Sequence, residues 1–340
     1  MNEITRVAID TSKSVFTLHA VDARDRPVLR RNLRRQDLVS FFAKLPTVDV
    51  AMEACGGSHY WGRTLQAMGH RVRLIPAQYV KPFVKRSKND RNDAQAISEA
   101  AARPGMQEVA VKSADAQARA MLLTVRELLV RQRTQLVNAL RGHATEMGLV
   151  APVGGKGLVA LRSEIEADAT LPEAAAEALR LLGREADRLE ARLAEIDKNL
   201  LAQHKADPNS RRLSAIPGVG PMSALSFSRM VDATQFKSGR HFAAWLGLVP
   251  REISTGGKQR LGGISRAGNE RLRQLLVLGA TAVIRFAKPG RPSASAWLLA
   301  LLERKPRKLA AVALANKMAR IIWAMLTRGE DYRSAKPVVA

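Results

Sequence analysis

The first hundred residues alternate between short apolar runs and segments with helical periodicity. Three runs rich in β-branched residues, ITRVAID (4–10), SVFTLHAV (14–21) and PVLRRNL (27–33), predict strands joined by short turns. The same pattern predicts helices at 36–45, 60–69 and 89–102 and further strands at 48–53 and 71–76. This order of elements favours an α/β domain in which helices cover a mixed sheet.

Helical periodicity dominates the rest of the chain. A long helical stretch at 115–147 is followed by a Pro/Gly break at 152–157 and by a second long helix with a heptad seam. The seam consists of Leu179, Leu182, Ala186, Leu189, Leu193, Ile196 and Leu200. Such a seam fits one helix of an ordinary bundle, or a coiled coil with 115–147 or with another protomer. We therefore expect an α/β domain at 1–112, a helical or coiled-coil region at 113–208 and a mostly helical domain at 209–340.

The net charge of the chain indicates what kind of molecule it binds. It has 55 lysines and arginines against 31 aspartates and glutamates, which gives a formal net charge of +24 and a pI near 11.1. Such an excess attracts polyanions, and because it is spread along the whole chain it favours nucleic acid over a lipid surface. Aromatic residues make up only 4%, which argues against rows of base-stacking rings.

Cysteine usage and hydropathy indicate the cytoplasm. Cys55 is the only cysteine, so neither an internal disulfide nor a cysteine-rich metal cluster can form. The amino-terminal segment lacks the apolar core of a signal peptide, and the longest apolar run, at 275–284, is too short to cross a bilayer. We therefore expect a cytoplasmic protein with no membrane partner.

Four carboxylates occupy strand ends and a helix start. Asp10 ends the first predicted strand, Glu53 ends the fourth, and Asp90 and Asp93 share one face at the start of the helix at 89–102. In a ribonuclease H-like sheet the first and fourth strands are neighbours and this helix crosses them, so the four acids would converge. Converging carboxylates repel one another unless cations lie between them, and two Mg²⁺ ions ~3.5–4 Å apart suit phosphodiester chemistry. Taken singly, Asp90 could instead cap the helix, Asp93 could interact with its dipole, and Asp10 could belong to a turn.

Two further features point to phosphate binding. The cations around the aspartates, Lys85, Arg86, Lys88 and Arg91, would hold the polyanion that the carboxylates alone repel. SAIPGVGPMSA (214–224) resembles the hairpin of helix-hairpin-helix modules, in which glycines, here Gly218 and Gly220, let backbone N–H groups approach a phosphate. The alternative for this motif is a tight turn between two helices.

A hydroxyl-bearing loop follows in LGLVPREISTGGKQRLGGISRAGNERLRQLL (246–276). Ser254 and Thr255 precede the pair Gly256-Gly257. The cations that follow are Lys258, Arg260, Arg266, Arg271 and Arg273. A hydroxyl among cations can attack phosphorus. Residue types alone favour a plain loop, because no Asp or His is spaced nearby as a base.

Together and in this order, these stretches resemble the DEDD transposases of the IS110 insertion-sequence group, in particular its IS1111 branch, with the DNA invertase Piv as a relative. The resemblance covers nearly the whole chain. It is carried by AIDTSK with Asp10, AMEACGGSHYWG with Glu53, KNDRNDAQAI with Asp90 and Asp93, LSAIPGVGPMSA, the 246–276 stretch and ALANKMARIIWAML (313–326).

The resemblance implies a RuvC-like nuclease domain, a coiled-coil insertion and a C-terminal transposase domain. It implies a bacterial, nucleoid-associated recombinase that excises and inserts its element, with Mg²⁺ held by the four acids. Its partners would be double-stranded donor and target DNA, a structured bridge RNA as guide, and further copies of the chain in a dimer or tetramer. A C-terminal serine would attach to DNA and form a composite site with the acids across protomers. Ser254 matches that serine by position, whereas in many relatives the hydroxyl next to glycine aligns with Thr255.

Two other functions fit part of the pattern. A Holliday-junction resolvase would use the same acids with water as nucleophile and would leave no protein–DNA adduct. A non-enzymatic binding protein would hold duplex with a steep salt dependence and leave the strands intact. The residues beyond the heptad helix favour the recombinase, because a simple resolvase would not require them.

Overall fold

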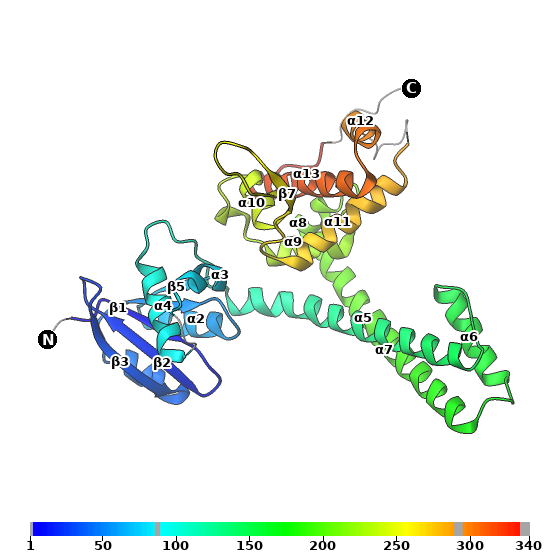
Figure 1. The fold of residues 1–340 in the computed structure, drawn as a ribbon, viewed down its shortest axis with the longest axis horizontal. Helices are drawn as coiled ribbons and strands as arrows, with labels where there is room; N and C mark the ends of the chain where they lie inside the picture. The colour runs from blue at the N-terminus through cyan, green and yellow to red at the C-terminus, as the bar shows by residue number, and fades with distance from the viewer. Residues whose placement is uncertain (1–2, 86–88, 289–294, 334–340) are drawn as a thin grey trace. The chain divides into compact units, whose positions relative to one another are not determined.

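The computed structural model describes residues 3–85, 89–288 and 295–333, and the chain divides into two compact units, Met1–Ala118 and Arg119–Ala340 (Figure 1). The first unit contains β1 (Arg6–Asp10), β2 (Val15–Val21), β3 (Pro27–Arg34), η1 (Arg35–Asp37), α1 (Leu38–Phe42), β4 (Asp49–Glu53), α2 (Ser58–Ala67), β5 (Arg71–Ile75), α3 (Ala77–Val80), η2 (Lys81–Phe83) and α4 (Asp90–Ala102). The second contains most of α5 (Ala114–Glu146), α6 (Gly155–Ala167), α7 (Glu173–Ala206), α8 (Pro208–Leu213), α9 (Pro221–Met230), η3 (Ala233–Gln235), α10 (Gly239–Trp245), β6 (Pro250–Glu252), β7 (Leu261–Ile264), α11 (Glu270–Arg285), α12 (Ala296–Arg304) and α13 (Arg307–Arg328).

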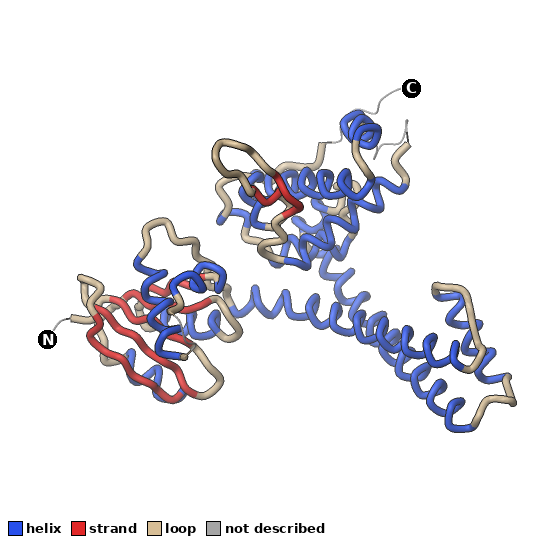
Figure 2. Tube along the Cα trace, viewed as in Figure 1, coloured by secondary structure: helices blue, strands red, loops and turns tan. Residues whose placement is uncertain are grey.

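A five-stranded mixed sheet in the order β3-β2-β1-β4-β5 forms the first unit (Figure 2). β1 pairs antiparallel with β2 and parallel with β4, while β2–β3 is antiparallel and β4–β5 is parallel. The predicted α/β class is therefore confirmed, and the first and fourth strands are neighbours, as expected of a ribonuclease H-like sheet.

Alternation along the central strands assigns each residue to one face of this sheet. Val7 and Ile9 of β1 pack in a core with α1 and α2, whereas Ala8 of β1 and Ala51 of β4 pack in a second core with α4. Because the side chains between α4 and the sheet are small, the helix lies close to the strand ends. This close packing sets the position of the first turn of α4.

The heptad seam of α7 faces α5 of the same chain. Leu200 clusters with Leu123, and Leu179 clusters with Leu140, so the two helices run antiparallel. Ion pairs between the two helices join Arg126 to Asp197 and, at 3.7 Å, Arg133 to Glu190.

Helix α13 lies at the centre of the C-terminal core. In length and hydropathy it meets the criteria for a membrane span, the one helix among the described residues that does. It contains no long uninterrupted apolar run, because lysine and arginine occur within it. Its buried residues pack against α10 and α11 in the main core of this unit, which explains its apolar character without a bilayer.

Candidate active site

The sheet register makes Asp10 and Glu53 neighbours. β1 and β4 are parallel and Ile9 pairs with Met52, so Asp10 and Glu53 occupy the next positions at the carboxyl ends of adjacent strands. Alternation places both on the face of Ala8 and Ala51, which is the face covered by α4.

Helix α4 adds two carboxylates to this position. Its N-cap is Asn89, whose side-chain oxygen accepts a 2.8 Å hydrogen bond from the backbone N–H of Asn92, so Asp90 is not the cap. Asp90 and Asp93 lie in the first turn. Carboxylate oxygens of Asp10, Asp90 and Asp93 all lie within 4.8 Å of one another, and we call these three residues the acid cluster.

The carboxylates of the acid cluster repel one another. Burial, then Asp93, Asp90 and Glu53, raise the pKa of Asp10 to about 6. Burial and Asp93 also raise the pKa of Glu53, which lies outside the set of oxygens within 4.8 Å but interacts with it. Several carboxylate oxygens in one partly buried place suit a hard divalent cation, which would relieve this repulsion.

The cations predicted around the acid cluster have different surroundings. Lys85 lies 3.9 Å from Glu99 of α4, and Arg91 is exposed in the first turn of that helix. Arg86 and Lys88 lie outside the described residues.

The glycine hairpin between α8 and α9 is shaped by packing against α11. Gly218 has φ +86°, and a methyl group added to it would lie 2.6 Å from the carbonyl oxygen of Gly279. A methyl group added to Gly279 would lie 2.0 Å from the carbonyl oxygen of Gly218. The two backbones are therefore in contact, and this close packing is enough to explain why residue 218 is a glycine. Contact of Gly218 with phosphate stays a prediction. Gly220 is exposed ahead of α9 with open space around its Cα, and its predicted contact with phosphate stays a prediction.

Ser254 lies in a β-hairpin rather than the plain loop suggested by residue types. β6 and β7 pair antiparallel, and Thr255 bridges Lys258 across a two-residue turn. Gly256 and Gly257 have φ of +56° and +75°, which suits the left-handed turns that close tight hairpins. The strands were missed because they are short and mostly exposed, and β7 contains two glycines, so no apolar alternation marks them.

Glu252 is a neighbour of Ser254 that the sequence reading missed. The Ser254 hydroxyl donates to Glu252 Oε1 at 3.0 Å and accepts from the backbone N–H of Arg260 at 3.2 Å. The Thr255 hydroxyl has no hydrogen-bond partner in the described part of the chain. The sequence offered one indication of this contact, because Glu252 lies only two residues before Ser254.

The cations after this hairpin divide into two groups. Lys258, Arg260 and Arg266 are exposed. Arg271 forms a 3.2 Å ion pair with Glu127 of α5, and burial lowers its pKa. Arg273 is 8% exposed and donates to the carbonyl oxygens of Leu246 and Ala267 at 3.1 and 2.7 Å. The second group supports the fold of this unit, and nucleic-acid binding by Arg271 stays a prediction.

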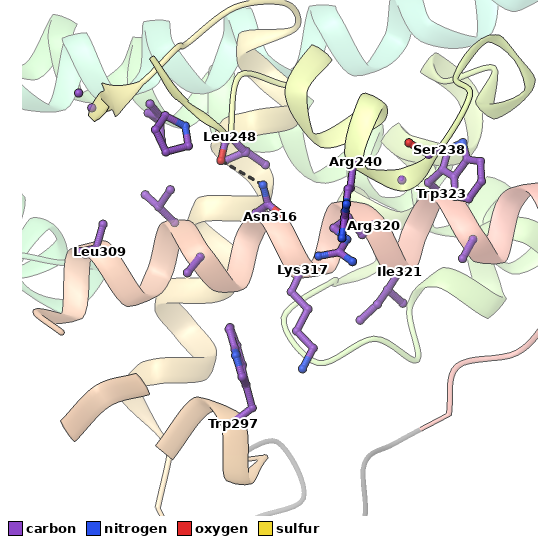
Figure 3. Close-up of a pocket in the computed structure, with 18 residues that line it drawn as sticks. Ser238, Arg240, Leu248, Trp297, Leu309, Asn316, Lys317, Arg320, Ile321 and Trp323 are labelled. Carbon is purple, nitrogen blue, oxygen red and sulfur yellow. Dashed lines mark hydrogen bonds between the residues drawn. The ribbon is translucent and has the colours of Figure 1, made fainter. Parts of the chain in front are cut away.

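A cavity of about 1100 Å³ lies over α13, next to the serine hairpin (Figure 3). Pro250 and Gly263 of the hairpin strands belong to its lining. Its cations are Arg240, Lys317 and Arg320, and no acidic residue lines it among those described. Lys317 Nζ lies 4.3 Å from the ring centroid of Trp297, and Asn316 Nδ2 donates to the Leu248 carbonyl oxygen at 3.1 Å. Its charge suits a polyanion, and the sequence reading did not find it.

Two family models match the chain. Residues 7–148 match the transposase model of the IS110 DEDD type, and residues 210–294 match the model described as Transposase IS116/IS110/IS902 family. The first match contains Asp10, Glu53, Asp90 and Asp93, and the second contains Ser254.

Relatives align over nearly the full length. The chain is 51% identical to a Sinorhizobium fredii protein named as a transposase, y4pF/y4sB, over 99% of this chain and 87% of the relative. It is 42% identical to the transposase for insertion sequence element IS1111A of Coxiella burnetii, over 98% of this chain and 92% of the relative. It is 36% identical to the transposase for insertion sequence element IS1328 of Yersinia enterocolitica, over 97% and 98%.

Proposed function

Because the chain belongs to the DEDD transposases of the IS116/IS110/IS902 family, it is an enzyme that cleaves and rejoins DNA, and from this premise we propose how its residues do so. Asp10, Glu53, Asp90 and Asp93 hold divalent ions, in the cell Mg²⁺. The observation that carries this is the acid cluster, three carboxylates within 4.8 Å on a face shared with Glu53. When bound, the ions polarise the scissile phosphodiester and neutralise its developing charge.

Ser254 is the nucleophile in this proposal, and Glu252 takes its proton. The Oγ–P bond forms as the P–O bond to the leaving strand breaks, and the leaving oxygen takes up a proton. A hydroxyl of another strand then attacks the serine–phosphate linkage, which restores the serine and yields a joined phosphodiester. The hydrogen bond at 3.0 Å supports Glu252 as the acceptor, because a base must lie within hydrogen-bond reach of the proton it removes.

Guidance and assembly complete the proposal. A structured bridge RNA pairs with donor and target DNA and supplies the sequence information, as base pairing does in other RNA-guided enzymes. The exposed cations Lys258, Arg260 and Arg266 and the cavity over α13 bind nucleic-acid backbone. The chain acts as a dimer or tetramer at the nucleoid, because strand exchange joins four DNA ends.

Strand joining tests the acid residues. Purified protein with Mg²⁺, its RNA and labelled donor and target oligonucleotides should yield joined product, and Asp10→Asn should lower the rate at least about 100-fold. Asp115→Asn, an exposed aspartate in the first turn of α5, is the matched control and should join normally. Normal joining by Asp10→Asn would refute the metal site.

A denaturing gel tests the hydroxyl. Wild-type protein should form a covalent adduct with labelled DNA, Ser254→Ala should form none, and Thr255→Val should keep it. If Thr255→Val forms no adduct while Ser254→Ala still forms one, the nucleophile is Thr255. Cleavage with no adduct in any variant would favour water as nucleophile, as in a resolvase.

A further inference from the structure

A second cavity, of about 470 Å³, opens beside the acid cluster in the first unit. It is lined by Thr17, Leu18, His19, Arg30, Arg31, Asn32 and Arg91. Thr17 of β2 is the register partner of Asp10, and Arg91 lies between Asp90 and Asp93 on α4. The cavity and the acid cluster therefore share both a strand pair and a helix turn.

The register also shows which side chains face this cavity. Thr17 pairs with Asp10 and with Asn32, and His19 pairs with Ala8 and with Arg30. Directly paired residues lie on the same face of a sheet, and Ala8 faces α4, so these residues share the face of the acid cluster.

The floor of the cavity is polar and buried. Thr17 and His19 are each only 4% exposed. Thr17 Oγ1 donates to Asn32 Oδ1 at 3.2 Å, which leaves the amide N–H groups of Asn32 as donors. His19 Nδ1 is buried without a hydrogen-bond partner among the described residues. Because an unpaired buried polar atom is costly, its position in a cavity wall points to a ligand.

The rim of the cavity is cationic. Arg30 and Arg91 are exposed and form no ion pair within the described residues. Arg30 makes one long hydrogen bond, 3.4 Å, to Gln95 of α4. The nearby acid Glu99 is engaged by Lys85 at 3.9 Å and by Gln95 at 2.8 Å. Two guanidinium groups that form no ion pair among the described residues, next to neutral donors, form a site for a phosphate.

We propose that this cavity binds a backbone phosphate of the DNA strand that is cut at the acid cluster. Arg30 and Arg91 neutralise the phosphate, while Asn32 and the Nδ1–H tautomer of His19 donate to its oxygens. The bound phosphate fixes the register of the strand, so the neighbouring phosphodiester lies at the carboxylates. This inference rests on the proposed function for the cut at the acid cluster, and the pocket itself can be tested without any cut.

The first test uses ¹⁵N-histidine-labelled full-length protein titrated with inorganic phosphate. The His19 resonance, identified by its loss in His19→Gln, should shift in wild-type protein and in Arg24→Gln, and should shift about tenfold more weakly in Arg30→Gln. Arg24 is the matched control because it is an exposed arginine of the β2–β3 turn that does not line the cavity. No shift in wild-type protein, or a shift unchanged in Arg30→Gln, would overturn the site.

The second test replaces single phosphates near the cut with neutral methylphosphonates and measures strand joining. A methylphosphonate at one position other than the scissile phosphate should slow strand joining by the wild-type protein about tenfold. The same methylphosphonate should have no effect on joining by Arg30→Gln or Arg91→Gln. If each methylphosphonate slows these variants as much as it slows the wild-type protein, the cavity does not bind the DNA strand that is cut. Weaker binding of RNA alone in these variants would assign the pocket to RNA instead. If the His19 resonance shifts with phosphate but the wild-type protein joins no strands, the phosphate site is supported and the proposed function is refuted.

Discussion

Glu252 and Ser254 are joined by a side-chain hydrogen bond in the C-terminal unit. The hydroxyl has one acceptor and one donor, which fixes the direction of its proton toward the carboxylate. An exposed serine without such a partner would rotate freely, and its proton would pass to water. In the proposed mechanism, this hydrogen bond is what would activate the Ser254 hydroxyl as a nucleophile.

Replacing Glu252 with Gln should lower the rate of adduct formation at least about 100-fold, because the amide keeps the shape but cannot take a proton. DNA affinity, measured by fluorescence anisotropy, should stay within about twofold of wild type. Glu303→Gln, an exposed glutamate on α12, is the control and should react normally. Adduct formation at the wild-type rate in Glu252→Gln would exclude the carboxylate as the base.

Metal binding at the acid cluster should strengthen as pH rises through 6. Burial, followed by Asp93, Asp90 and Glu53, raises the pKa of Asp10 to about 6, so below that pH a proton occupies the carboxylate and above it the anion is free to bind. Displacing one proton should change Mn²⁺ affinity about tenfold between pH 5 and pH 7, measured by calorimetry. Asp10→Asn should remove this dependence, and equal affinity of the wild-type protein at both pH values would contradict it.

Among the elements, α11 is in direct backbone contact with the turn between α8 and α9. Gly279→Ala places a methyl group 2.0 Å from the Gly218 carbonyl oxygen, so the turn that contains Gly218 must move away from α11. We expect a loss of roughly 1–3 kcal/mol in the free energy of unfolding, measured in urea. Gly142→Ala is the matched control, because Gly142 is a helical glycine of α5 with open space around it, and it should gain roughly 0.5–1 kcal/mol. A loss in both variants, or in neither, would contradict the packing argument.

The order of helices and strands could be predicted where burial of one face gives the sequence a regular spacing of apolar residues. The alternation in β1 and β4 and the Asn89–Asp93 helix start are visible in the sequence, and they place the four acids at strand ends and a helix turn. Gly218 was interpreted through a local motif, but its close neighbour is 61 residues away, at Gly279, and local patterns cannot show such a contact. The cavity beside the acid cluster was not predicted for the same reason, because its lining comes from two strands and a helix.

At the scale of the whole molecule, the acids and the serine belong to different compact units. Asp10 to Asp93 all lie within Met1–Ala118, and Ser254 lies within Arg119–Ala340. The fragment 1–118 has its own sheet and two cores, so it should fold alone and bind Mn²⁺ with an affinity within about threefold of the full chain. Calorimetry and circular dichroism would check this, with the Asp10→Asn fragment as the control. A folded fragment that does not bind the metal would show that the site needs residues beyond 118.

β3 has no strand on its outer side among the described residues, and Arg30, Arg31 and Arg34 lie along it. A bare strand edge offers unpaired backbone groups to any other copy of the chain, and repeated addition of this kind produces fibres. Positive charge along the edge repels such copies until a polyanion covers it. Arg30, which we assign to a DNA phosphate, would then have a second role shared with Arg31 and Arg34, namely to keep unliganded copies from pairing through β3. Removing all three together should therefore cause precipitation.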